Sequence, residues 1–361
     1  MGAVSIVVTM ASTQPLVTVG MAVYNGEKYI AEAISSVLAE TYQAWELLLV
    51  NDCSRDSSID VARSFTDPRI RVLENDTNLG LVGVRNKIMQ EARGTYIAWL
   101  DQDDLTLPAR LSTQVAFLEA NPDYAVCGSW TKTRTELPDG LAQIATEHLP
   151  CSHEEIRAAM LFLNPIACNT VTMRRKDFVS RGLEFRPAFG NSLDYDLWSM
   201  ASDELRMCNL PQALAIYRVH GDQTSQGDAL ERMNGRAMEI QVGLAQRALE
   251  IEMSDDDRTW HRLATIAPVI VESASDLNHV ADWFGRLRAA NAAQRSFDVW
   301  QFDRALSRQW TTVVLSALRS VVGPTTAITI ALKGFQTMGV GKTSIASSLT
   351  AGARRRKARH G

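Results

Sequence analysis

Three aspartates fall within four residues, directly after an apolar run of the sequence. The run is Tyr96–Leu100, and Asp101, Asp103 and Asp104 follow it. A single aspartate in such a place is usually a turn residue or a helix cap. Three of them repel one another unless a cation lies among them, and Mg²⁺ and Mn²⁺ prefer carboxylate oxygens as ligands. The spacing therefore indicates a divalent-cation site that keeps coordination positions open for phosphate.

Polar residues also follow two other segments that resemble strands. The turn Tyr24–Glu27 comes after Val17–Val23, and Asn51 and Asp52 come after Trp45–Val50. In an open α/β sheet, ligands bind beyond the carboxyl ends of the strands. We therefore expect these residues and the three aspartates to gather along one edge of a sheet.

The elements that position these residues alternate regularly between strand and helix. The spacing predicts strands at Val17–Val23, Trp45–Val50, Ile70–Leu73 and Tyr96–Leu100, and helices at Glu27–Glu40, Ser57–Phe65, Leu81–Arg93 and Pro108 to about Ala120. This alternation is typical of βαβ units and of a mainly parallel sheet covered on both faces. Further helices are expected near Ser152–Phe162 and Asp194–Ala201, and residues 226–303 have the pattern of helices with charged faces.

The composition is that of an ordinary soluble globular protein. The 361 residues are 46% apolar and 22% charged with a net charge of −4, which excludes a disordered chain, a collagen-like fibre and a disulfide scaffold and does not suggest a nucleic-acid partner. Five dispersed cysteines predict reduced thiols in a cytoplasmic protein. The start of the chain lacks the basic residues of a signal peptide, and no charge-free apolar run is long enough to predict a membrane-spanning helix.

Four motifs, in order, resemble those of glycosyltransferase family 2, whose members have the GT-A fold. They are VTVGMAVYNGEKYIAEAISSVLAETYQAWELLLVNDCSRDSS, NLGLVGVRN with GTYIAWLDQDD, LDYDLW, and YRVHGDQTS, and they span roughly Pro15 to Ser225. The resemblance implies an α/β fold: a GT-A type, Rossmann-like, mainly parallel sheet flanked by helices, with a helical C-terminal extension. We expect a short N-terminal extension at 1–14 and a glycosyltransferase domain at 15–225. Its nucleotide-binding half would be 15–110 and its acceptor half 111–225, followed by a helical region with a basic amphipathic tail at 226–361.

The resemblance also implies roles for individual residues. On the donor side, Asp52 would bind the nucleobase, with uracil as the expected base, and Tyr24 would flank it. Glu27 would lie near the ribose, Arg85 would approach the diphosphate, and Asp101 would contact ribose or metal.

The same resemblance assigns the metal and the base. Asp103 would hold Mn²⁺ or Mg²⁺ against the diphosphate, and His220 is either a second metal ligand or a surface histidine. Asp194 would be the general base, with helix capping as the alternative. One base without a placed nucleophile implies a single displacement that inverts the anomeric carbon.

The predicted activity is the transfer of a sugar from a nucleotide-sugar donor to a carbohydrate or lipid-linked acceptor, in the synthesis of cell-surface polysaccharide or glycolipid. A nucleotidyltransferase is an alternative, although no glycine-rich phosphate loop follows the first strand. A catalytically degenerate nucleotide-sugar-binding protein is another, because Leu193 stands where the family commonly has glutamate.

The tail is strongly basic and contains two apolar stripes with helical spacing. The 58 residues after Asp303 hold ten basic and no acidic residues. The stripes, at 310–322 and 327–335, could pack on the catalytic domain, or they could lie on the inner face of a membrane while RRRKAR at 354–359 meets anionic lipid. Both interpretations remain open at this point, and on the second the protein would be peripheral to the membrane.

Three further patterns look like sites but are incomplete. GVGKTS at 339–344 lacks the first glycine of a phosphate-binding loop, and Cys151 between His148 and His153 lacks a second pair at zinc spacing. The run Asp255–Asp257 is expected to start a helix.

Overall fold

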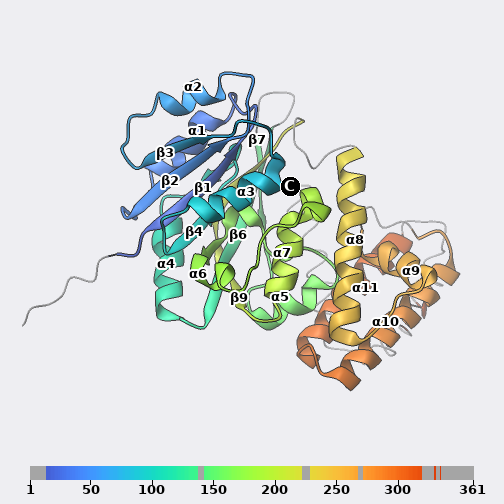
Figure 1. Cartoon of the computed structure of the whole chain (residues 1–361). Coiled ribbons are helices and arrows are strands. Elements are labelled where there is room, and N and C mark those ends of the chain that lie inside the picture. The colour runs from blue at the N-terminus through green and yellow to red at the C-terminus, as the bar shows by residue number, and fades with distance from the viewer. Residues whose placement is uncertain are drawn as a thin grey trace, which may run out of the picture.

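The computed structural model describes residues 14–136, 142–221, 228–266 and 271–318, together with Thr329, Ile330 and Gly334. Within these residues nine strands form one sheet, which helices flank, and a group of four C-terminal helices gathers on one side of it (Figure 1). The strands are β1 (Val17–Val23), β2 (Trp45–Asn51), β3 (Ile70–Glu74), β4 (Tyr96–Trp99), β5 (Leu105–Thr106), β6 (Tyr124–Glu136), β7 (Ala142–Glu147), β8 (Thr172–Arg174) and β9 (Arg206–Val219).

Every strand and helix predicted before Ala120 is present within a few residues of its expected bounds. The α-helices are α1 (Ile30–Leu38), α2 (Ser58–Arg63), α3 (Gly80–Glu91), α4 (Arg110–Ala120), α5 (His153–Met160), α6 (Arg175–Val179), α7 (Leu193–Ala201), α8 (Asp228–Leu249), α9 (Asp255–Thr265), α10 (Ala274–Gln294) and α11 (Val299–Ala317). Two 3₁₀ segments, η1 (Cys168–Thr170) and η2 (Pro187–Ser192), precede β8 and α7.

The sheet has the order β3-β2-β1-β4-β8-β6-β9-β5, with β7 paired to β6. The first four strands are parallel neighbours, as the βαβ pattern predicts, and the register pairs Val17 with both Trp45 and Tyr96. The second half is mixed: β8 is antiparallel to β4 and β6, β5 is antiparallel to β9, and β6 is parallel to β9. The irregular pattern after residue 123 therefore corresponds to strands that reverse direction.

Alternate residues of the central strands point into two separate apolar cores. In β2, Leu47 and Leu49 join the core beneath α1 and α4, whereas Leu48 and Val50 join the core beneath α3, α5 and α7. All seven residues of β2 are buried, which explains why its sequence is an almost continuous apolar run. The predicted sheet with two covered faces is thus confirmed.

The helices α8 to α11 extend the second of these cores. In α11, Trp310, Val313, Val314 and Ala317 are buried, and α11 packs against α5 of the sheet-bearing part. These four residues of the first apolar tail stripe therefore pack inside the protein, whereas Leu318 of the same stripe is 37% exposed. Most of the second stripe, the GVGKTS segment and the RRRKAR cluster lie outside the described residues.

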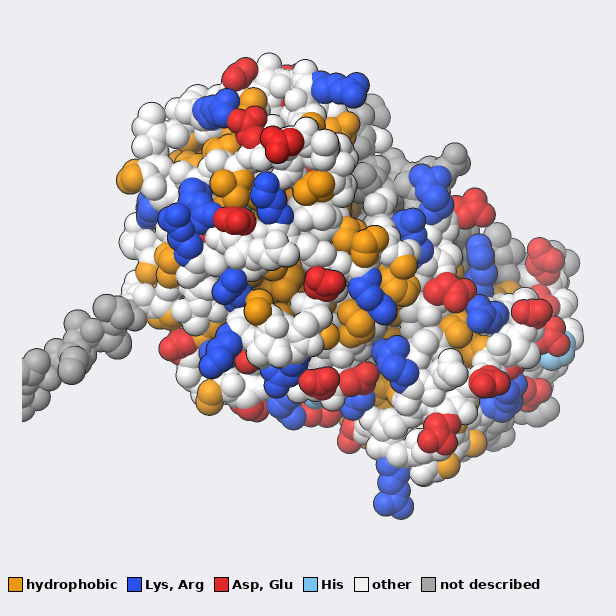
Figure 2. Space-filling view, viewed as in Figure 1, with side chains coloured by type: hydrophobic (Ala, Val, Ile, Leu, Met, Phe, Trp, Pro, Cys, Tyr) orange, Lys and Arg blue, Asp and Glu red, His pale blue; other side chains and the backbone are white. Residues whose placement is uncertain are grey.

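The acidic run at 255–257 starts α9, as expected. Ser254 and Asp257 form a reciprocal capping box, and the Asp257 carboxylate also pairs with Arg286. None of the described helices has the length and apolarity needed to cross a membrane. Figure 2 shows basic and acidic side chains interspersed over the described part of one face.

Candidate active site

The strand-end residues lie along one edge because β2, β1 and β4 are parallel neighbours. The amide of Gln102 joins two of the loops: its Nε2 donates to the Tyr24 carbonyl at 2.9 Å, and its Oε1 accepts from the Tyr24 N–H at 3.0 Å. A Cβ on Gly26 would overlap this amide, so a larger residue there would displace the Gln102 side chain from these contacts. The sequence analysis did not single out Gln102, although its place between Asp101 and Asp103 was a usable signal.

Asp52 follows β2 and is almost fully buried, with its carboxylate against the start of α3. Its Oδ1 accepts from the Leu79 N–H and from the Asn75 amide, both at 2.8 Å, and its Oδ2 accepts from the Gly80 N–H at 2.8 Å. The carboxylate therefore organises the loop before α3 through hydrogen bonds from backbone and amide donors. An ionised carboxylate can accept about four hydrogen bonds, so Oδ2 retains capacity for one more donor.

Tyr24 and Glu27 lie in the loop after β1, beside the loop after β2. Tyr24 is 46% exposed, which leaves its ring accessible to a ligand. The Glu27 Oε2 accepts from the Ser57 N–H at 2.9 Å, and the Glu27 N–H donates to Asp56 Oδ2 at 3.0 Å. The two loops thus brace each other through reciprocal carboxylate contacts.

Arg85 is buried on α3 and links several groups of the site. Its Nη2 donates to Asp101 Oδ1 at 2.8 Å and its Nη1 contacts the Cys168 Sγ at 3.0 Å. The charge of Arg85 also acts on Asp194 and opposes the rise in the pKa of that carboxyl. Arg85 therefore pairs with the strand-end carboxylate, and its charge also acts on the predicted base.

The aspartates after β4 point to different partners. Asp103 Oδ2 lies 3.1 Å from His220 Nε2, and the His220 ring stacks on Tyr29. Burial, followed by the neighbouring charge of Asp101, raises the pKa of the Asp103 carboxyl. Asp104 is fully buried and accepts from the Asn169 amide at 2.6 Å and from the Arg218 N–H at 3.0 Å, so it anchors η1 and β9.

Asp103 and His220 are side chains of the kinds that bind metals, a carboxylate and an imidazole, and here a hydrogen bond of 3.1 Å joins them. Among the described residues no group of three or more His, Cys, Asp or Glu side chains is arranged to hold a metal. A cation at this place would therefore need further ligands from a bound substrate or water, and diphosphate oxygens fit that need.

Asp194 lies in the first turn of α7, where Ser192 is the N-cap residue. Its Oδ2 accepts from the Asn164 amide at 2.9 Å. Burial raises the pKa of the Asp194 carboxyl, as suits a base that must take a proton near neutral pH. The sequence analysis missed Asn164, because nothing in the local pattern links positions 30 residues apart.

Asp196 and Leu193, which lie close to Asp194 in the sequence, are buried in other surroundings. Asp196 is buried and its carboxylate is held by Arg186, with Nε donating to Oδ2 at 2.8 Å, so it is already neutralised. Leu193 is buried in the apolar core, which accounts for an apolar residue where the family commonly has glutamate.

The possible zinc pattern at 148–153 has a structural explanation. The His153 Nδ1 accepts from the Met207 N–H at 3.4 Å, and burial lowers the pKa of this histidine to about 4.

The five cysteines, all of which lie in the described part of the chain, are free thiols.

The sheet, with βαβ units in its first half and carboxylates at its strand ends, has the arrangement of the GT-A fold. The family model described as Glycosyl transferase family 2 matches residues 18–183. A glycosyltransferase of Haemophilus influenzae is 35% identical over 218 residues, which are 58% of this chain and 68% of that protein. The Bacillus subtilis protein named as glycosyltransferase EpsE is 34% identical over 67% of this chain and 85% of its own length. The chain belongs to glycosyltransferase family 2 and is a glycosyltransferase.

Solved structures agree with the fold. The complex of Staphylococcus aureus TarS with UDP-GlcNAc superimposes with a TM-score of 0.52 at 16% identity, over 89% of this chain and 92% of that one. This coverage includes much of the helical C-terminal region as well as the sheet.

Proposed function

We propose that this protein transfers a sugar from a nucleoside diphosphate donor, with UDP as the expected nucleotide, to an acceptor hydroxyl, with inversion at the anomeric carbon and with the help of Mn²⁺ or Mg²⁺. One observation carries the proposal: the buried Arg85 pairs with the strand-end Asp101 at 2.8 Å, and its charge also acts on the half-buried carboxylate of Asp194. The donor machinery and the predicted base therefore belong to one electrostatic cluster.

The donor assignment is supported by the relatives' names and by the loop geometry. Two Escherichia coli relatives are named as UDP-Glc transferases, and the TarS structure contains UDP-GlcNAc. In this chain Asp52 keeps an acceptor position for a nucleobase N–H, Tyr24 offers an exposed ring, and Glu27 lies in the adjoining loop. These three residues would hold the nucleoside, with uracil as the expected base.

Asp103 and His220 are the residues that would hold the cation. The mannosyltransferase PcManGT of Pyrobaculum calidifontis was solved with GDP-Man and Mn²⁺, so a protein of similar fold accommodates such an ion. A divalent ion supplies positive charge to the diphosphate as it leaves. Arg85 adds a fixed positive charge near the same place, and burial makes that charge more effective.

Asp194 is the proposed general base. It would remove the proton of the acceptor hydroxyl as the oxygen attacks the anomeric carbon, and the bond to the diphosphate would break on the opposite side of the sugar. Asn164 would orient the carboxylate, and both Asn164 and Arg85 oppose the rise in its pKa that burial causes. Because Asp196 is neutralised by Arg186, one base acts alone, which favours a single inverting displacement.

The acceptor class follows from the relatives' printed roles. Both Escherichia coli proteins act on α-D-GlcNAc-diphosphoundecaprenol, and others are named for teichuronic and colanic acid biosynthesis. We propose a role in cell-surface polysaccharide or glycolipid synthesis, with a carbohydrate or lipid-linked acceptor. The alternative of a degenerate protein depends on Leu193 alone, since Asp52, Asp103 and Asp194 are all present, and no contact among the described residues favours a nucleotidyltransferase.

The proposal is tested by hydrolysis and transfer assays with a panel of nucleotide sugars, with Mn²⁺, with Mg²⁺ or with EDTA. We expect one donor to be used and the activity to vanish in EDTA. In Asp103→Ala turnover should be lost and UDP binding in Mn²⁺ should weaken, whereas UDP binding in EDTA should match the wild type. Full activity in EDTA, or unchanged turnover in Asp103→Ala, contradicts the metal-dependent mechanism.

A further inference from the structure

The two segments that would hold the donor follow strands that separate before either segment begins. We call Tyr24–Glu27 the nucleoside loop and Asp101–Asp104 the cation segment. The parallel ladder between β1 and β4 ends with the pair Gly20 and Trp99, although β1 continues to Val23. Another contact must therefore hold the nucleoside loop beside the cation segment.

The side chain of Gln102, in the cation segment, makes this contact. Its Oε1 accepts from the Tyr24 N–H at 3.0 Å, and its Nε2 donates to the Tyr24 carbonyl at 2.9 Å. One amide thus binds both polar groups of one backbone residue, as a residue in an antiparallel pair of strands does. The two bonds fix the orientation of the Tyr24 backbone, and with it the direction in which the exposed ring leaves the loop.

The same amide covers the next turn of the nucleoside loop. A Cβ on Gly26 would lie 2.3 Å from Gln102 Oε1 and 2.4 Å from its Cδ, so the amide rests directly on the Gly26 backbone. On the side of β2, the Asn25 N–H donates to Ser54 Oγ at 3.1 Å, and Asn25 Oδ1 accepts from the Arg55 N–H at 2.9 Å. Because β1 lies between β2 and β4, the loop is held from both sides, and Gln102 is the contact on the side of β4.

We propose that Gln102 is a positioning residue that couples the cation segment to the nucleoside loop. Through Tyr24, Gln102 would set how tightly the nucleoside is bound, even when neither cation nor phosphate is present. The adjacent Asp103 would instead act only on the diphosphate and its cation. The inference rests on the proposed function, because that proposal places one donor on both segments.

The test is an equilibrium titration that needs no turnover. The probes are uridine, UDP in EDTA and UDP in Mn²⁺, with guanosine and GDP as a second nucleoside and nucleotide. Gln102→Met keeps the length of the side chain but not its amide. We expect its affinities for uridine and for UDP in EDTA to fall about 5-fold, the scale of one neutral hydrogen bond. Asp103→Ala should weaken UDP only in Mn²⁺, so the two adjacent residues give different patterns.

Two combined variants separate the coupling from general damage to the fold. In a Tyr24→Ala background, Gln102→Met should cause no further loss of UDP binding in EDTA, because the ring through which Gln102 acts is gone. Gly26→Ala should push the flexible amide aside and reproduce the loss seen in Gln102→Met. Adding Gly26→Ala to Gln102→Ala should change nothing more, because no amide remains to be displaced.

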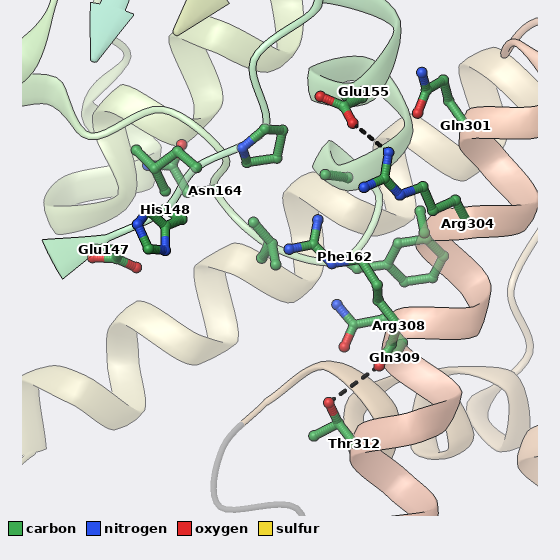
Figure 3. Close-up of a pocket in the computed structure, with 15 residues that line it drawn as sticks. Glu147, His148, Glu155, Phe162, Asn164, Gln301, Arg304, Arg308, Gln309 and Thr312 are labelled. Atoms are coloured by element: carbon green, nitrogen blue, oxygen red, sulfur yellow. Dashed lines mark hydrogen bonds and ion pairs between the residues drawn. The ribbon is translucent and has the colours of Figure 1, made fainter. Parts of the chain in front are cut away.

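Two other glutamines supply matched controls. Gln309→Met alters a half-buried glutamine of α11 that lines a cavity of about 270 Å³ between α11 and α5 (Figure 3). The described lining of that cavity contains no residue of the nucleoside loop or of the cation segment. Gln43→Met removes an amide that donates to the Glu40 carbonyl at 3.0 Å, before β2 and hence at the opposite end of the strands. Both variants should bind all probes as the wild type does.

Three outcomes would overturn the inference. They are unchanged binding of uridine and of UDP in EDTA by both Gln102→Met and Gly26→Ala, additive losses when Gln102→Met is combined with Tyr24→Ala, and a loss confined to UDP in Mn²⁺, which would assign Gln102 to the cation alone. A wild type that binds none of these nucleosides and nucleotides would disprove the proposed function together with this inference. Nucleotide binding by the wild type that Gln102→Met leaves intact would disprove only the coupling.

Discussion

At the scale of single residues, the catalytic proposal depends on the environment of Asp194. Burial raises the pKa of its carboxyl, while the charge of Arg85 and the hydrogen bond from Asn164 lower it. The ionised form is the active base, so activity falls when the pH drops through this pKa. Each of these neighbours therefore controls where the acidic limb of the pH–rate profile lies.

We predict that Asn164→Ala moves the acidic limb of kcat to higher pH. The reason is that the amide hydrogen bond stabilises the ionised carboxylate, so its removal raises the pKa of Asp194 further. The measurement is kcat against pH with saturating donor and acceptor.

Asp194→Asn is the companion variant and should lower the rate about 100-fold or more at every pH, with donor binding retained. An unmoved acidic limb in Asn164→Ala, or activity within a few-fold of wild type in Asp194→Asn, would assign the base to another residue.

At the scale of elements, one buried carboxylate after α1 connects that helix to β5 and to α4. Glu40, just after α1, accepts hydrogen bonds from the Thr106 hydroxyl in β5 and from the Leu111 N–H in α4. Burial raises the pKa of Glu40 from 4.5 to about 7. Because the folded-state pKa is the higher one, the contribution of this group to the free energy of unfolding is full below pH 4.5 and is lost as the pH rises through 7.

We predict that Glu40→Gln flattens the pH dependence of stability between pH 5 and pH 8. Glutamine keeps both contacts, because its carbonyl can accept from Leu111 and its amide can donate to Thr106, but it does not titrate. The change in the free energy of unfolding over this range should shrink by up to roughly 3 kcal/mol, as measured by urea denaturation at both pH values. Glu204→Gln, at an exposed ion pair, is the matched control and should keep the wild-type dependence. Equal slopes for Glu40→Gln and wild type would show that Glu40 titrates normally.

At the scale of the whole molecule, the C-terminal helices and the sheet-bearing part share one apolar core. Trp310 of α11 is fully buried in that core and packs edge-on against Phe284 of α10. A truncation after Asp303 would remove this side chain and leave only the first five residues of α11. The buried residues of the first apolar stripe, Trp310, Val313, Val314 and Ala317, thus belong to the protein core.

We predict that Trp310→Ala destabilises the protein by about 3–5 kcal/mol, because the surrounding core cannot fill the space that the indole leaves. Trp300→Ala is the matched control on the same helix, since Trp300 is 64% exposed, and its effect should stay within about 0.5 kcal/mol. The measurement is chemical denaturation followed by far-UV circular dichroism and by tryptophan fluorescence. The two signals should shift together, and a shift confined to one of two separate transitions would contradict a shared core.

The local patterns of the sequence were sufficient for the first half of the fold. Apolar runs such as Trp45–Val50 and helical spacing such as Ile30, Ala33, Ile34 and Val37 depend on neighbouring residues alone, and the structure has these elements where they were expected. The clustering of Asp52 and the Asp101–Asp104 segment along one edge followed as well, because parallel strands place their carboxyl ends together. The strand directions after residue 123 did not follow, because pairing between distant strands leaves no local periodicity.

Only the tertiary structure decided which partner each functional residue has. The sequence identified Asp194, but the amide of Asn164 reaches it from another segment, and the same is true of Cys168 beside Arg85. Asp103 and Asp104 look equivalent in the sequence, yet they have different partners. Asp103 contacts His220, whereas Asp104 accepts hydrogen bonds from Asn169 and Arg218. Likewise, an apolar stripe specifies that a helix must bury one face but not against what, and α11 buries that face in the protein's own core. Residue types and spacing fix the chemistry that is available, whereas the packing of distant segments determines which groups meet.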